Sequence, residues 1–105
     1  MDNEQLKSDL TALFRRAGPA HHQAYIQTNG DDAEWPLWYA EYLQADLQNL
    51  IGVEMTRSEM VYWMVRLYKE HQIHAPHSPW AEFYADYFMR HLEGVGKLGS
   101  SPHDL

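Results

Sequence analysis

The sequence predicts an all-α protein: a bundle of four or five helices arranged as two helical hairpins. Three observations favour this fold class. Apolar residues recur at helical spacing along most of the 105-residue chain. Glycine and proline fall between these stretches, and no sustained alternation of apolar and polar residues predicts a strand. An aromatic motif that begins at Trp35 occurs again at Trp80, 45 positions later.

Composition indicates a single globular domain. Apolar residues make up 45% of the chain and aromatic residues 13%, which is enough to bury a core. We expect this domain to span residues 1–94. Gly96, Gly99 and Pro102 interrupt the last stretch, so residues 95–105 are predicted to form a flexible tail. No apolar run approaches the roughly 20 residues that a membrane-spanning helix needs, so we expect no membrane association.

Charge and cysteine content exclude several classes of function. The net charge is −7, from 8 basic and 15 acidic residues, which disfavours nucleic-acid binding because an acidic surface repels phosphates. The chain has no cysteine, which excludes disulfides, thiolate catalysis and cysteine-based metal centres. Its acidic, polar first residues do not resemble a secretory signal peptide. We therefore expect a cytoplasmic protein.

Residues 3–17 are predicted to form the first helix, since apolar residues recur there every three or four positions. Gly18-Pro19 is expected to break this helix, because proline lacks an N–H group and disfavours a helical residue before it. A shorter helix over residues 19–28 then follows, with Pro19 in its first turn. Asn29-Gly30 supplies the left-handed conformations that end it.

The next helix is predicted over residues 31–51. Asp31-Asp32 places carboxylates at the positive end of its dipole. Pro36 is tolerated in the first turn, where N–H groups have no helical partner, and Gly52 follows the last turn.

Two further helices complete the predicted bundle. Thr56-Arg57-Ser58-Glu59 is a capping box, which starts a helix that reaches about residue 71. Residues 73–77 are predicted to form a loop. Ser78-Pro79 combines a cap with a first-turn proline and starts the last helix, which reaches about residue 92.

The repeated motif predicts internal symmetry. It reads Trp-x-x-Trp-Tyr-Ala-Glu-Tyr-Leu from Trp35 and Trp-x-x-Phe-Tyr-Ala-Asp-Tyr-Phe from Trp80. Each copy opens the second helix of a predicted hairpin, and two similar hairpins can pack with pseudo-two-fold symmetry. The alternative is coincidence, because aromatic residues at spacings of three and four arise in any core helix.

Four ionisable residues are predicted to face inward among apolar neighbours. A helix turns about 100° per residue, so the face on which each side chain lies can be assigned. Asp46 falls in the middle of the apolar face of the 31–51 helix, and His91 occupies the equivalent place in the second copy of the motif. His71 lies near the centre of the face of its helix, and His21 shares a side with apolar residues of the short helix.

These four residues have two interpretations, because a buried charge is costly unless it is paired. In the first they converge, and Asp46 orients a histidine as a general base or joins histidines to bind iron, manganese or zinc. In the second, which is the more common arrangement, each lies near a helix end and reaches water or a free carbonyl group. The helical metal motifs His-Glu-x-x-His and Glu-x-x-His are absent. We therefore predict no cofactor, with a transition metal as the alternative.

Seven aromatic residues are predicted to line a pocket or an interface: Trp35, Trp38, Tyr39, Tyr42, Trp63, Trp80 and Tyr84. As a pocket they would take a planar or cationic ligand, with tyrosine hydroxyls as polar anchors. As an interface, Trp38 and Trp63 would contact a partner from the borders of their apolar faces. Residues of these types also serve simply as core. Of the two functional interpretations we favour the interface, and with it a homodimer or another protein partner.

The run EWPLWYAEYL, which follows HHQAYIQTNGDD, resembles a group of small bacterial proteins, cyanobacterial ones among them, that carry a Glu-Trp-Pro-x-Trp-Tyr-Ala motif. The resemblance covers residues 20–92. It implies a self-contained helical domain of bacterial, cytoplasmic origin and carries over no catalytic residue. We therefore predict a protein-interaction or regulatory domain that self-associates. The alternative is a small-molecule or metal-binding protein, or an enzyme, built on the aromatic pocket and the Asp/His cluster.

Overall fold

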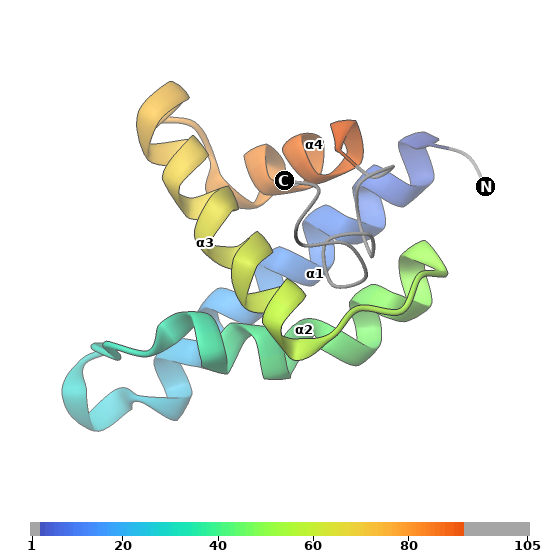
Figure 1. Ribbon diagram of the computed structural model, residues 1–105. Coiled ribbons are helices and arrows are strands. Elements are labelled where there is room, and N and C mark those ends of the chain that lie inside the picture. Colours follow the sequence, from blue (N-terminus) through green and yellow to red (C-terminus); the bar gives the residue numbers. More distant parts are fainter. Residues whose placement is uncertain (1–2, 92–105) are drawn as a thin grey trace.

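Four α-helices make up most of residues 3–91, the part of the computed structural model that is described, and no strand occurs in that range (Figure 1). They are α1 (Asn3–Ala24), α2 (Trp35–Ile51), α3 (Arg57–His74) and α4 (Trp80–Arg90). The predicted all-α class is confirmed. The predicted tail, residues 95–105, lies outside the described residues.

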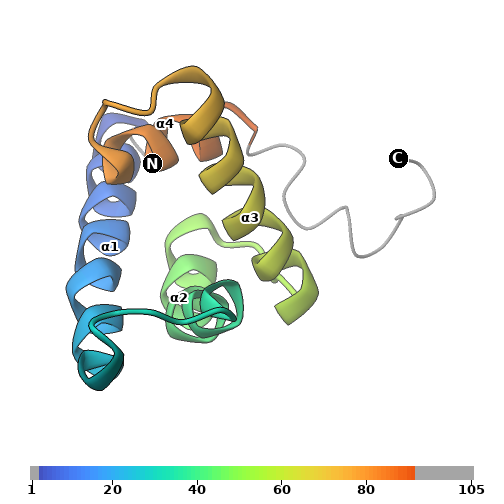
Figure 2. The same ribbon diagram turned by 90° about the vertical axis from the view of Figure 1, so that its left-hand side faces the viewer.

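The helices form a four-sided arrangement around a shared apolar core (Figure 2). α1 packs against α2 and α4, and α3 packs against the same two helices. α1 and α3 lie on opposite sides, and α2, which Figure 2 shows nearly end-on, crosses between them. Each helix therefore contacts its own hairpin partner and one helix of the other hairpin. Within the described range, no helix combines the length and apolar character that a bilayer crossing requires.

The predicted break at Gly18-Pro19 is wrong, because α1 continues through both residues to Ala24. Ala17 and His21, on either side of Pro19, are both buried, so one continuous face of α1 packs against the bundle. That packing outweighs the cost of proline in a helix interior, which is about 3 kcal/mol or more. Pro19 itself is exposed, so its ring displaces no core contact.

The chain reverses direction after α1 through a short 3₁₀ turn, η1 (Ile26–Thr28). Asn29 and Gly30 follow it with φ angles of 57° and 90°. Their predicted left-handed conformations are confirmed, although they end η1 and not a separate α-helix.

The predicted end of α2 is confirmed, while its predicted start is too early. Gly52 adopts a φ of 70°, and its N–H donates to the carbonyl oxygen of Gln48 at 2.8 Å. Asp31-Asp32 lies in the loop before the helix, and Glu34 occupies the cap position. The Glu34 N–H donates to Oδ1 of Asp32 at 3.0 Å, so this aspartate orders the loop that leads into α2.

The capping box at the start of α3 is confirmed. The Glu59 N–H donates to Thr56 Oγ1 at 3.1 Å, and the Thr56 N–H donates to Glu59 Oε1 at 2.9 Å. α3 runs three residues beyond its predicted end, to His74. The prediction that Ser78 caps the last helix is wrong, because its hydroxyl donates back to the carbonyl oxygen of Ala75.

Burial repeats between the two halves of the chain and supports the internal repeat. Buried positions of α1 recur in α3 50 residues later, as the pairs Leu10/Met60, Leu13/Trp63, Phe14/Met64, Ala17/Leu67 and His21/His71. Buried positions of α2 recur in α4 45 residues later, as Ala40/Ala85 and Leu43/Phe88. The spacing changes because the connection from α1 to α2 is five residues longer than the connection from α3 to α4.

The first tryptophan of each motif copy packs on the other half of the chain. The Trp35 ring lies 5.3 Å from the ring of Tyr68 on α3, measured between centroids. Trp80 rests on α1 at Gly18, where an added Cβ would come within 3.2 Å of its Cζ2 atom. Gly18 and Tyr68 are also 50 residues apart, so the two contacts occupy equivalent places in the repeat. The two halves therefore interlock through these tryptophans.

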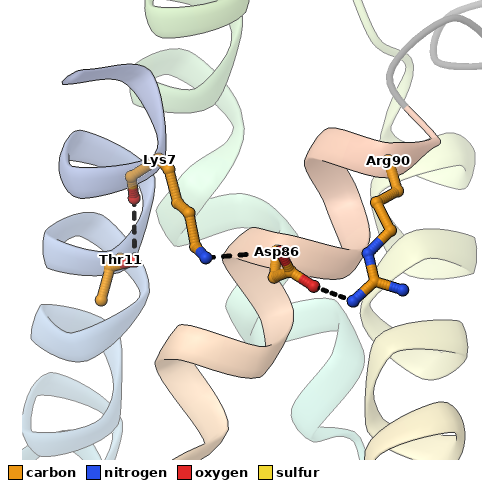
Figure 3. A network of polar contacts seen from close by, with 4 residues as sticks. All are labelled: Lys7, Thr11, Asp86 and Arg90. Atoms are coloured by element: carbon orange, nitrogen blue, oxygen red, sulfur yellow. Dashed lines mark hydrogen bonds and ion pairs between the residues drawn. The ribbon is translucent and has the colours of Figure 1, made fainter. Parts of the chain in front are cut away.

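Ion pairs also join α1 to α4 (Figure 3). Nζ of Lys7 lies 3.3 Å from Oδ1 of Asp86, whose second oxygen accepts from Arg90 one turn later on α4. Burial alone would raise the pKa of Asp86, but these two cations hold it below its ordinary value. Because all three side chains are substantially exposed, each pair contributes only about 0–1 kcal/mol to stability.

Candidate aromatic cleft

An open cleft of about 340 Å³ lies where the two halves of the chain meet. Five aromatic side chains form most of its wall: Trp35, Tyr39, Tyr68, Trp80 and Tyr84. The two tryptophans occupy equivalent places in the repeat, as do Tyr39 and Tyr84. His21, Gly30, Asp31 and Asp32 complete the lining at one end. The cleft thus has an aromatic body and a single acidic end.

The rings meet at steep angles, so the cleft has walls facing in several directions. Trp35 and Tyr39 lie with centroids 5.8 Å apart and planes at 86°. Trp80 and Tyr84 form an equivalent corner, at 5.1 Å and 72°. Tyr68 meets Trp35 at 57°. At such corners the edge of one ring lies toward the face of its neighbour, and the faces of aromatic rings carry the negative part of the quadrupole.

Three tyrosine hydroxyl groups also gather at the cleft. Burial raises the pKa of Tyr39 and, more strongly, that of Tyr84. The nearby Tyr39 and Tyr68 raise the pKa of Tyr84 further. The hydroxyls of Tyr39 and Tyr84 therefore remain neutral at physiological pH.

A hydrogen-bonded pair, His21 and Asp32, closes the acidic end. His21 Nε2–H donates to Oδ2 of Asp32 at 3.0 Å, and the two side chains are only 10% and 8% exposed. The hydrogen bond with His21 is the main reason that the pKa of Asp32 lies below its ordinary value, with the Glu34 N–H and the Tyr25 hydroxyl contributing as well. Asp32 therefore stays negatively charged at neutral pH.

Asp31 differs from its neighbour because its carboxylate is exposed. Among the described residues no side chain forms an ion pair with it. Its charge at the mouth of the cleft is therefore available to a ligand.

His71 is the counterpart of His21 in the second half. Its Nε2–H donates to the carbonyl oxygen of Ser78 at 2.9 Å, in the loop before α4. The ring of His71 packs on Phe83 and Tyr84, as that of His21 packs on Trp38 and Tyr39. Each buried histidine thus ties a loop to the aromatic corner that follows it, which is a structural role.

The structure does not bring the four predicted polar residues together. Asp46 is 56% exposed, with its Oδ2 atom 3.8 Å from Nη2 of Arg16 on α1, so its predicted inward position is wrong. His91 follows α4, and its Nδ1–H donates to the carbonyl oxygen of Tyr87 at 2.9 Å. Within residues 3–91 no group of three His, Asp or Glu side chains could hold a metal ion.

The predicted aromatic residues divide into three groups. Trp35, Tyr39, Trp80 and Tyr84 line the cleft. Trp38 and Tyr42 stack on each other outside it, with centroids 4.9 Å apart and planes at 14°. Trp63 is only 2% exposed and belongs to the core, so its predicted place at the border of α3 is wrong.

Sequence reasoning missed four cleft residues: Gly30, Asp31, Asp32 and Tyr68. The two aspartates lie four and three positions before the first aromatic motif, and that position could have suggested their place. Tyr68 carries no such signal, because it reaches the cleft only through the packing of α3 against Trp35.

Comparison with protein-family models, with curated proteins and with solved structures finds no match for this chain. The chemistry of the cleft is therefore the basis for a functional proposal.

Proposed function

We propose that this chain is a binding module for a small organic cation, held in the aromatic cleft. The observation that carries the proposal is the set of five aromatic side chains that meets two aspartates in one cleft. Cations bind favourably over the faces of tryptophan and tyrosine, by up to about 2 kcal/mol for a desolvated contact. A nearby carboxylate adds a favourable charge–charge interaction. The volume of about 340 Å³ suits a small ligand or the end of a longer one.

The electrostatics of the chain support a cationic ligand. The low pKa of Asp32 keeps its charge in place at neutral pH, and Asp31 adds a second negative charge at the mouth. The net charge of −7 also attracts cations over a longer range. An anionic ligand would be repelled by the negative potential at this end of the cleft.

A binding role fits His21 better than acid–base catalysis. Rings of Tyr25, Trp38 and Tyr39 surround its imidazole, with centroids about 5 Å away. Its Nε2 atom is engaged with Asp32. A histidine enclosed in this way orders the loop that carries the aspartates, and it keeps the acidic end of the cleft in shape.

Titration of the purified chain with choline, butylammonium and agmatine tests this proposal. We expect each to bind measurably, and the tightest at least about tenfold more tightly than 3,3-dimethylbutan-1-ol, the uncharged isostere of choline, because the alcohol lacks the cation–π and charge terms. Calorimetry gives the dissociation constants. Trp35→Leu and Trp80→Leu should each weaken binding, whereas Tyr42→Leu, which removes an exposed aromatic ring outside the cleft, should not. Equal affinity for choline and the alcohol, or no binding by any cation, would contradict the proposal.

Self-association is a second candidate function, favoured by a different surface. The stacked pair Trp38 and Tyr42 lies outside the cleft on α2, and Leu37, the residue before Trp38, is 47% exposed. A second copy of the chain could cover this apolar face. Sedimentation velocity should then show a dimer that Leu37→Glu converts to monomer with its helical content unchanged. A monomer at high micromolar concentration would exclude this candidate and leave the cation proposal untouched.

A further inference from the structure

We infer that the cleft prefers a singly charged, methylated ammonium group over a primary ammonium or a guanidinium group. The inference rests on the proposed cation binding and names the ligand class. Three features of the cleft carry it. They are the angles between its rings, the hydrogen bonds that its buried carboxylate already accepts, and the presence of acidic residues at only one of its two ends.

Ring angles favour a compact, rounded head group. The ring pairs that line the cleft meet at 48° to 86°, so faces and edges surround the space. A guanidinium group is flat and stacks parallel to an aromatic ring. The nearly parallel ring pairs elsewhere in the described chain lie outside the cleft lining: Trp38 with Tyr42, Phe83 with Tyr87, and Tyr87 with His91. A methylated ammonium group presents methyl groups in every direction and can contact several rings at once.

Hydrogen-bonding capacity disfavours a primary ammonium group. Such a group carries three strong N–H donors and is tightly hydrated, so its burial requires good acceptors. The buried carboxylate of Asp32 already accepts from His21 at one oxygen and from the Glu34 N–H at the other. The exposed carboxylate of Asp31 remains, together with neutral tyrosine hydroxyls, which accept more weakly than an ionised oxygen. Methylation removes the N–H donors and lowers the hydration that burial must overcome, while the positive charge is retained.

Charge at only one end of the cleft indicates a single positive charge on the ligand. Asp31 and Asp32 stand four and three positions before Trp35. The equivalent positions before Trp80 are Pro76 and His77, so the second half supplies no matching acid there. A ligand with a second cationic group would place it beside Trp80 and Tyr84 without a counter-charge. The cleft is therefore matched to a monocation, although its aromatic walls are nearly symmetric.

A methylation series tests the inference directly. Methylammonium, dimethylammonium, trimethylammonium and tetramethylammonium are titrated into the full chain, with tryptophan fluorescence and calorimetry as readouts. We expect affinity to rise along the series, with tetramethylammonium about tenfold tighter than methylammonium, because each methyl group removes one N–H donor and adds ring contact. Guanidinium should bind more weakly than tetramethylammonium, and putrescine no more tightly than butylammonium.

Variants separate the ring contribution from the charge contribution. Tyr68→Leu should flatten the methylation series, whereas Tyr62→Leu, the same change on another face of α3, should leave it intact. Asp31→Asn should weaken every cation by a similar factor and leave the order of the series unchanged. Methylammonium or guanidinium binding as tightly as tetramethylammonium would overturn the inference while cation binding stands. Failure of every cation in the panel would overturn the proposed function as well.

Discussion

Replacing Phe88 with alanine is expected to destabilise the fold by about 3–5 kcal/mol, the range measured for deletion of a buried phenylalanine ring. Phe88 is fully buried, and its ring meets the edge of Trp63 with centroids 5.3 Å apart. The cavity left behind would lie beside a second large side chain that cannot collapse into it. Guanidinium denaturation followed by far-UV circular dichroism measures the free energy of unfolding.

The repeat supplies a matched comparison for this prediction. Leu43 stands 45 positions before Phe88, and it is equally buried. Leu43→Ala should lower the free energy of unfolding by about 2–5 kcal/mol. The two substitutions, one in each half of the chain, should therefore destabilise the protein by similar amounts, in one cooperative unfolding transition. A loss below about 1 kcal/mol for either variant would argue that this part of the core packs differently. Two separate transitions would argue against a core shared between the hairpins.

Replacing Gly30 with alanine is expected to lower stability by about 1–3 kcal/mol. Gly30 has a φ of 90°, a conformation that residues with a Cβ rarely adopt. An added Cβ would also lie 2.9 Å from Nδ1 of His22. The residue belongs to the loop that carries Asp31 and Asp32 to the cleft, so relief of the strain should displace that end. Denaturation gives the stability, and ligand titration reports the displacement.

Gly52→Ala is the matched control, since Gly52 has a φ of 70° but an added Cβ there meets no atom within 4 Å. It should cost about 1 kcal/mol from backbone strain alone, with cation binding unchanged. In the double variant His22→Ala/Gly30→Ala the side-chain clash is absent and only the strain remains. A Gly30→Ala protein as stable as the wild type would show that the loop adopts another backbone path at no cost.

Helix boundaries could be predicted wherever local chemistry decides them. The Thr56 capping box satisfies backbone groups through side chains only three residues away, and its prediction is confirmed. Gly52 and the pair Asn29-Gly30 end their segments through left-handed backbone conformations, a preference of the residue itself. The break predicted at Gly18-Pro19 failed because distant packing outweighs the local preference. Burial of Ala17 and His21 on one face keeps α1 continuous.

The cleft was only partly predictable. Its four motif residues, Trp35 and Tyr39 with Trp80 and Tyr84, were among the predicted pocket residues because of their residue types and their repetition. Asp46 was misplaced because helical-wheel arithmetic centred the inward face on Trp35 and Tyr39. The core-facing stripe of α2 instead follows its buried residues, Ala40, Leu43 and Leu47. The large rings at the start of α2 face the cleft, so the two apolar surfaces of this helix are not one stripe.

Local sequence and tertiary packing thus decided different parts of this protein. Residue preferences that act over a few positions determined the all-α class and most helix ends. The two copies of the aromatic motif are visible in the sequence itself. Only the packed bundle decided that Trp35 meets Tyr68, that Trp80 meets Gly18, and that both tryptophans share one cleft. These contacts join helices from opposite halves of the chain, and no local preference encodes which helices cross. The acidic end depends on packing in the same way, because a turn after α1 brings Asp32 back to His21.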